Sequence, residues 1–140
     1  MSALTLKIAT QLASQALTAG RTISAAPLTI AVLDSGGHLI TLQREDGASL
    51  LRPQIAIGKA WGAIALGKGS RLLALDAQQR PAFIAALNSL GQGSVVPAPG
   101  GVARARYLVT FTVNSPRLSF TPVSLTPRKS VPSAGMTTEV

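Results

Sequence analysis

The chain contains a single histidine, His38, and no cysteine, which restricts the metal chemistry available to it. An imidazole nitrogen is a common metal ligand, but protein metal sites usually combine several His, Cys or carboxylate side chains. His38 directly follows the pair Gly36-Gly37, which predicts an exposed position beside a tight turn. A structural role in a hairpin is therefore the first interpretation of His38, and ligation of a metal ion is the alternative.

Three charged residues are candidates for a ligand site: Arg44, Asp46 and Lys59. Lys59 lies in an apolar, helix-like segment, where a lysine either extends its amine to solvent or neutralises a carboxylate such as that of Asp34 or Asp46. The same amine could instead meet the carboxylate of a ligand. Arg44 could hold a carboxylate through its forked guanidinium, or form a local ion pair with Asp46 around the turn at Gly47.

Backbone N–H groups offer a second way to bind an anion. Gly100 and Gly101 follow Pro99 in a loop rich in glycine and proline, where N–H groups are open to close approach. The loop is not a phosphate-binding P-loop, because no Lys-Ser or Lys-Thr pair follows it. Neither a Ser-His-Asp arrangement nor a pair of carboxylates at catalytic spacing is evident, so no residue is assigned a catalytic role.

The elements that must position these residues follow from the apolar pattern. Two β-branched segments, 28–33 and 38–44, flank the Gly-Gly turn and predict a β-hairpin. Four-residue spacing of apolar side chains predicts a first helix over 4–19, ended by Gly20. Residues 107–113 alternate like a strand, and the prolines beyond them predict an irregular segment. Three further helices are predicted over 51–66, 70–77 and 81–90.

Composition limits the classes of function. At 140 residues the chain has the size of one domain. Its net charge of +8 is scattered along the chain instead of being clustered on one element with aromatic side chains, so specific nucleic-acid binding is not expected. The sequence lacks an apolar segment long enough to cross a membrane and shows no signal-peptide pattern, so we expect a cytoplasmic protein with no membrane partner, although export of the native product stays open.

Four segments carry a resemblance to a known family. They are 31–39, which contains Asp34-Ser35-Gly36-Gly37-His38; 44–48, which reads Arg44-Glu45-Asp46-Gly47-Ala48; 55–60, which ends in Gly58-Lys59-Ala60; and 97–102, which reads Pro97-Ala98-Pro99-Gly100-Gly101-Val102. Over about residues 4–102 the chain resembles the GlcG-like or HbpS-like haem-degrading family, also seen as the C-terminal domain of PduO-type proteins. This resemblance implies an α+β fold with a mainly antiparallel central sheet and packed helices in profilin-like layers.

The last third of the chain departs from that family. Family members usually continue with a Gly-rich strand pair and an acidic helix, whereas residues 103–140 are basic and rich in Pro, Ser and Thr. We therefore divide the chain into a domain over 1–113 and an irregular tail over 114–140. A change of reading frame near Ala103 is one interpretation of the tail and would make the chain a non-functional product. Part of the sheet would then be unpaired or filled by residues 107–113.

The resemblance implies a protein that binds a small anionic or aromatic ligand, with haem as the cofactor and haem binding or haem degradation as the function. His38 is then the candidate haem-iron ligand, if necessary across a subunit boundary, and a Thr, Tyr or Lys is the alternative. The second hypothesis is a self-associating, non-enzymatic accessory protein of a glycolate, diol or glycerol catabolic operon, so whether the protein is an enzyme is left open. The ligand-binding residues implied by the resemblance are Arg44, Asp46, Lys59, Gly100 and Gly101.

Overall fold

The computed structural model describes residues 4–104 and 107–112. These residues form four helices and one four-stranded sheet in which each neighbouring pair of strands is antiparallel. The strand order is β2-β1-β4-β3, and the predicted α+β fold is confirmed. The elements are α1 (Leu6–Thr22), β1 (Thr29–Leu33), β2 (Leu39–Arg44), α2 (Arg52–Leu66), α3 (Ser70–Gln79), α4 (Pro81–Leu90), β3 (Gly101–Arg104) and β4 (Tyr107–Thr112).

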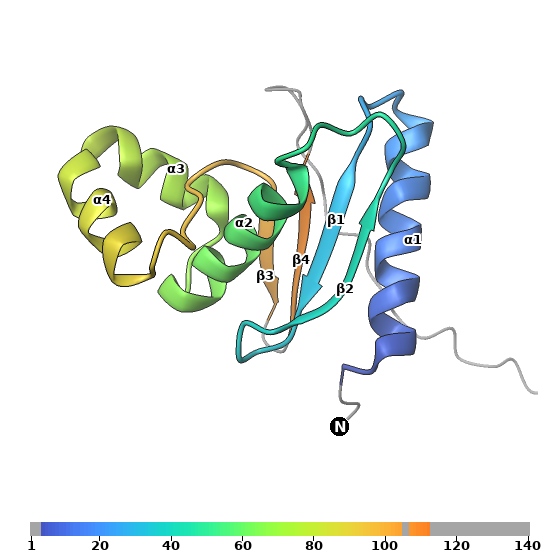
Figure 1. Ribbon diagram of the computed structural model, residues 1–140, viewed down its shortest axis with the longest axis horizontal. Helices are drawn as coiled ribbons and strands as arrows, with labels where there is room; N and C mark the ends of the chain where they lie inside the picture. The colour runs from blue at the N-terminus through green and yellow to red at the C-terminus, as the bar shows by residue number, and fades with distance from the viewer. Residues whose placement is uncertain (1–3, 105–106, 113–140) are drawn as a thin grey trace, which may run out of the picture.

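Helices cover both faces of the sheet (Figure 1). α1 packs on one face and α2 on the other, whereas α3 and α4 form a helical hairpin beyond α2, away from the sheet. Among the described elements α4 contacts only α3, and α3 contacts α2 and β3, so α3 connects this hairpin to the rest of the fold. No helix in the described ranges has both the length and the apolar character that a membrane span requires.

The predicted β-hairpin is confirmed, and a glycine in the left-handed region closes it. Gly37 has φ +83°, a conformation that costs a residue without Cβ little, and its N–H donates to the Asp34 carbonyl. The Asp34 carboxylate accepts 2.9 Å hydrogen bonds from the N–H groups of Gly36 and His38. The register shifts between Val32 and Leu33, so that β2 has one extra residue opposite β1, as in a β-bulge. The hydrogen bonds to Asp34 hold the turn beyond this shift.

β1 is buried on both faces, and its alternating side chains define two separate cores. All five of its residues are buried, as expected for a central strand with a helix on each side. The helices approach through alanines, whose small side chains allow close packing against the sheet. The cluster on the α1 side contains Ala9, Ala13, Ala16, Leu28, Ile30 and Val32. The cluster on the α2 side contains Ala31, Leu33, Ala56, Ala60 and Ala63.

The predicted end of the first helix at Gly20 is wrong. Thr5 caps α1 by accepting a hydrogen bond from the Ile8 N–H, and the helix continues to Thr22. Gly20 is buried inside it, and a Cβ at this position would overlap the side chain of Leu28. Glycine is therefore needed here for close approach of helix and strand, although its usual place at a helix end suggested a stop.

The strand predicted over 107–113 is confirmed as β4, and its position in the sheet is central. β4 pairs with β1 on one side and with β3 on the other, so the region where the sequence departs from the family still completes the sheet. Of the two alternatives expected for this part of the sheet, unpaired or filled by residues 107–113, the second is confirmed, because β4 lies between β1 and β3. The domain boundary at 113 and the irregular segment 114–140 lie outside the described residues, and the frame-change interpretation stays a prediction.

Glu45 joins the hairpin to α1. One of its carboxylate oxygens accepts hydrogen bonds from the Leu28 backbone N–H at 2.6 Å and from the Arg21 guanidinium at 2.9 Å. Leu28 is 2% exposed, so removing the carboxylate would leave a backbone donor without a partner at the edge of the core. Glu45 therefore fixes the point where the chain enters β1.

We expect Glu45→Ala to lower the free energy of unfolding by about 1–3 kcal/mol, because the Leu28 N–H loses a charged acceptor. The neighbouring Asp46→Ala is the matched control, since Asp46 is exposed and should change stability by less than about 0.5 kcal/mol. Urea denaturation followed by circular dichroism measures both variants. Equal stabilities for the two variants would contradict the assigned role of Glu45.

Candidate functional site

Lys59 is a buried cation on α2, with only 4% of its surface exposed. Its Nζ donates a 2.9 Å hydrogen bond to the backbone carbonyl of Pro99. Two of the alternatives expected for Lys59, extension to solvent and pairing with Asp34 or Asp46, are wrong, because the residue is buried and the loop before β3 places its own carbonyl over the amine. Contact with a ligand carboxylate stays a prediction. Among the described residues, no carboxylate forms an ion pair with Lys59.

Burial changes the acid–base chemistry of this amine. Removal from water disfavours the ammonium form and is the main reason that the pKa of Lys59 falls from 10.5 to about 8. The positive charge of Arg52 lowers it further. Arg52 precedes Lys59 by seven residues, or two helical turns, so both residues lie on the same side of α2. The half-buried Arg52 and the buried Lys59 thus form one basic flank of the helix.

The loop over Lys59 is held against α3 and α4 by specific contacts. The Asn88 side chain accepts a hydrogen bond from the Val95 N–H, and the Ser70 hydroxyl oxygen accepts one from the Gly101 N–H. Gly101 is buried, and a Cβ there would lie 2.9 Å from the Ser70 hydroxyl oxygen and 3.0 Å from the Lys59 carbonyl oxygen. Close approach therefore requires glycine at position 101, and its N–H is already used within the protein.

Anion binding by Gly100 stays a prediction, and its N–H is separate from the Lys59 amine. Gly100 has φ +120° and is half-buried, directly after the carbonyl that receives the Lys59 amine. Within the part of the chain that the structure describes, the Gly100 N–H donates no hydrogen bond. The Pro99–Gly100 peptide bond is trans, so this N–H points away from the Pro99 carbonyl and from the Lys59 amine bound to it.

Arg44 and Asp46 lie at the end of β2, and both are exposed. The predicted ion pair between them does not form among the described residues; Glu45, which the sequence interpretation left out, forms the ion pair here, with Arg21. Arg44 lies opposite Thr29, on the side of the sheet that faces α2. The Thr29 hydroxyl is buried and has no hydrogen-bond partner among the described residues, so one polar position at this end of the sheet is unsatisfied.

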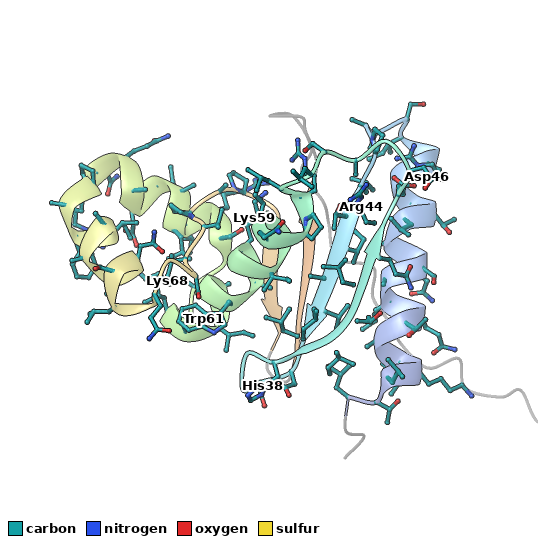
Figure 2. The ribbon with its side chains drawn as sticks, viewed as in Figure 1. His38, Arg44, Asp46, Lys59, Trp61 and Lys68 are labelled. Carbon is teal, nitrogen blue, oxygen red and sulfur yellow. The ribbon has the colours of Figure 1, made fainter. Side chains whose placement is uncertain are left out.

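His38 lies at the opposite end of β2 from Arg44 and Asp46 (Figure 2). The six-residue strand between them places the two ends roughly 17 Å apart. The His38 side chain is 82% exposed, and its Nδ1 is 3.3 Å from the Asp34 carboxylate. Over residues 4–104 and 107–112, no group of three or more His, Cys, Asp or Glu side chains could hold a metal ion.

α2 separates the turn from the basic flank. Trp61, to which the sequence interpretation gave no ligand role, contacts the turn, since a Cβ on Gly37 would lie 3.0 Å from its indole ring. Trp61 follows Lys59 by two residues, which is about 200° around a helix, so the two side chains leave α2 on different sides. Figure 2 shows Trp61 and His38 toward one end of the sheet and Lys59 farther up. One chain therefore does not bring His38 and Lys59 into one site.

Comparisons with known proteins agree with this architecture. A family model described as "Haem degrading protein HbpS-like" matches residues 4–105, and the chain belongs to this HbpS-like family. The solved structure of PduOC in complex with heme has a TM-score of 0.69 and 25% sequence identity, over 81% of this chain and 85% of that chain.

Two further solved structures share the fold. Protein ORFY of Klebsiella pneumoniae has a TM-score of 0.68 and 24% identity, over 80% of this chain and 79% of its own. A double mutant of HbpS from Streptomyces reticuli has a TM-score of 0.66 and 24% identity, over 80% of this chain and 75% of its own. No curated protein matches the sequence.

The lowered pKa of Lys59 makes stability depend on pH in a defined direction. Between pH 8 and 10.5 the unfolded chain binds more protons than the folded one, so the free energy of unfolding rises with pH across this window. We expect a contribution of at most about 3 kcal/mol. The free energy of unfolding is measured against pH for the wild type and for Lys59→Met, and the difference between the two curves gives the contribution of Lys59. Lys68→Met is the control, because Lys68 is exposed. Parallel curves for wild type and Lys59→Met would contradict the assignment.

Proposed function

We propose that this protein binds haem or a closely related porphyrin, and that the basic flank around Lys59 receives a carboxylate of the ligand. The single observation that carries the proposal is the buried Lys59 amine with no carboxylate partner among the described residues, in a chain of the HbpS-like family. The PduOC:heme complex supports it as the solved structure of a protein with the same fold.

The donor set on this flank fits a carboxylate. An ammonium group has three N–H donors, and the Pro99 carbonyl uses one of those on Lys59. Two donors remain for a ligand, and the Arg52 guanidinium lies on the same flank of α2. Hydrogen bonds between an ammonium and a carboxylate are shorter and stronger than neutral ones, so partial burial favours an anionic ligand at this position.

The same residues do not fit the iron of haem. His38 supplies the only imidazole of the chain, and its exposed side chain lies beside the hairpin turn, away from Lys59. A protonated Lys59 that binds a carboxylate has no lone pair for iron, so a haem held there would need an iron ligand from elsewhere, for example His38 of a second copy. Haem supplies iron redox chemistry when bound, whereas the residues of this flank bind and orient a carboxylate. We assign them no step in haem degradation.

A porphyrin titration tests the carboxylate contact. We expect hemin to shift its Soret absorbance on binding to the wild-type protein, and Lys59→Met to weaken binding about 10- to 100-fold, as expected for the loss of charged hydrogen bonds. The affinity for metal-free protoporphyrin IX, measured by fluorescence, should fall by a similar factor in Lys59→Met, because the proposed contact is to the carboxylate and not to iron. Lys68→Met should leave both affinities unchanged, since Lys68 is exposed and paired with Asp76.

Three outcomes of this titration carry different meanings. No Soret shift with the wild-type protein would contradict haem binding itself. Equal hemin affinity for wild type and Lys59→Met would contradict the basic flank as the ligand site. A loss confined to hemin, with protoporphyrin IX unaffected, would mean that Lys59 contacts the iron and not a carboxylate.

A second candidate function is a self-associating accessory protein, and the surface of the α3–α4 hairpin favours it. Leu72 and Leu75 are three residues apart on α3 and are about half exposed. Phe83 and Leu90 are seven residues apart on α4, and therefore on one side of that helix, with exposures of 48% and 81%. Exposed apolar surface of this kind commonly marks a protein–protein contact.

Light scattering coupled to size-exclusion chromatography tests self-association. We expect the wild-type protein to elute with a multiple of the monomer mass, and Leu72→Asp combined with Leu90→Asp to shift it toward the monomer, because charged groups cannot be buried unpaired in an interface. Lys7→Asp, an exposed change on α1, is the control for altered charge alone. A well-behaved wild-type monomer would contradict this candidate.

A further inference from the structure

Lys59 has the surroundings of a reactive amine as well as those of a binding residue. We propose that Lys59 acts as a nucleophile that condenses with small carbonyl compounds carrying a carboxylate, of the 2-oxo acid class, to form an imine. The inference concerns covalent chemistry and does not depend on porphyrin binding, because a carboxylate contact needs the ammonium form whereas condensation needs the neutral amine.

The hydrogen bonding of Lys59 leaves the nitrogen free to react. Its partner is the Pro99 carbonyl at 2.9 Å, which accepts a hydrogen from the amine and leaves the lone pair of the neutral form available. A carboxylate would hold the amine in the protonated state, but the ion pairs of the described residues use Asp34, Glu45 and Asp76 in other places. Burial of the side chain to 4% exposure acts in the same direction.

The loop segment over the Lys59 amine is the cover between this residue and solvent that the proposal requires a small molecule to pass. Pro99, whose carbonyl receives the Lys59 amine, is exposed, and Gly100 after it is half-buried. The segment that covers the nitrogen belongs to no helix or strand, so a small molecule would reach the amine by displacing Pro99 and Gly100. The absence of a side chain at Gly100 limits the steric barrier beside the amine.

Arg52 explains why the carbonyl compound should carry a carboxylate. It lies two turns before Lys59 on the same side of α2, and its charge acts on the Lys59 amine. A second cation beside a desolvated lysine is a known way to keep the amine neutral and nucleophilic. The guanidinium also offers a forked contact for a planar carboxylate, which would direct the adjacent carbonyl carbon toward Nζ.

The step balances without an added redox partner. The Nζ lone pair forms a bond to the carbonyl carbon, and a proton moves from nitrogen to oxygen to give a carbinolamine. Loss of water then gives the C=N bond of the imine, so one amine and one carbonyl yield one imine and one water. The lowered pKa of Lys59 supports this step, because at pH 7 about 10% of an amine with a pKa near 8 is neutral, against far less than 1% of an ordinary lysine.

Reductive trapping tests the proposal on the folded full-length protein. The protein is incubated at pH 7 with pyruvate and cyanoborohydride, and the adducts are located by mass spectrometry after digestion. We expect Lys59 to be labelled about tenfold or more faster than the exposed Lys7 and Lys68, because a larger fraction of its amine is neutral. Protein unfolded in urea should lose this preference. Equal or slower labelling of Lys59 in the folded protein would overturn the proposal.

Acetone is the matched probe for the role of Arg52, because it has a methyl group where pyruvate has a carboxylate. We expect pyruvate to label Lys59 faster than acetone, and Arg52→Gln to reduce that ratio severalfold. Arg80→Gln is the control, since Arg80 is exposed and paired with Asp76 at the end of α3. A pyruvate-to-acetone ratio of one in the wild-type protein would overturn the assigned substrate class. These labelling results are independent of whether hemin binds.

Discussion

The burial of β1 on both faces is the constraint on which the rest of this structure depends. A strand covered by a helix on each side leaves no face for water, so α1 and α2 are held by separate sets of apolar contacts. Alanines on both helices allow the close approach that this arrangement needs. Once α2 is seated in this way, the directions of all its other side chains follow from helical geometry.

That geometry places two different surfaces on one helix. Lys59 contacts the loop before β3, and Arg52 lies on the same side of α2 two turns earlier. Trp61 lies on a different side and contacts the hairpin turn that carries His38. A basic site and the only imidazole of the chain are thus separated within one protomer. For the proposed ligand this has a direct consequence: a single copy of the described fold offers donors for a carboxylate at Lys59 but holds its imidazole elsewhere.

Burying Lys59 without a carboxylate partner opposes folding at neutral pH, and the alanine-lined cores must offset this cost. An uncompensated buried cation is uncommon in a structural role, since most buried charges are paired. The same physical condition favours an anionic ligand when the amine is protonated and nucleophilic chemistry when it is neutral. Both proposals for this site therefore originate in one desolvated amine, although they use different protonation states of it.

The sequence by itself determined the features that depend on neighbouring residues. The Gly-Gly hairpin, the four helices and the strand over Tyr107–Thr112 follow from local spacing and turn chemistry, whereas the family resemblance rests on the matching sequence segments. Only the tertiary structure decided what depends on contacts between distant segments. Gly20 is a packing contact for Leu28, Glu45 and not Asp46 forms the ion pair, and Pro99 receives the Lys59 amine across 40 residues of chain. A residue's spacing predicts its side of a helix or strand, but the group that meets it there is set by how the elements pack.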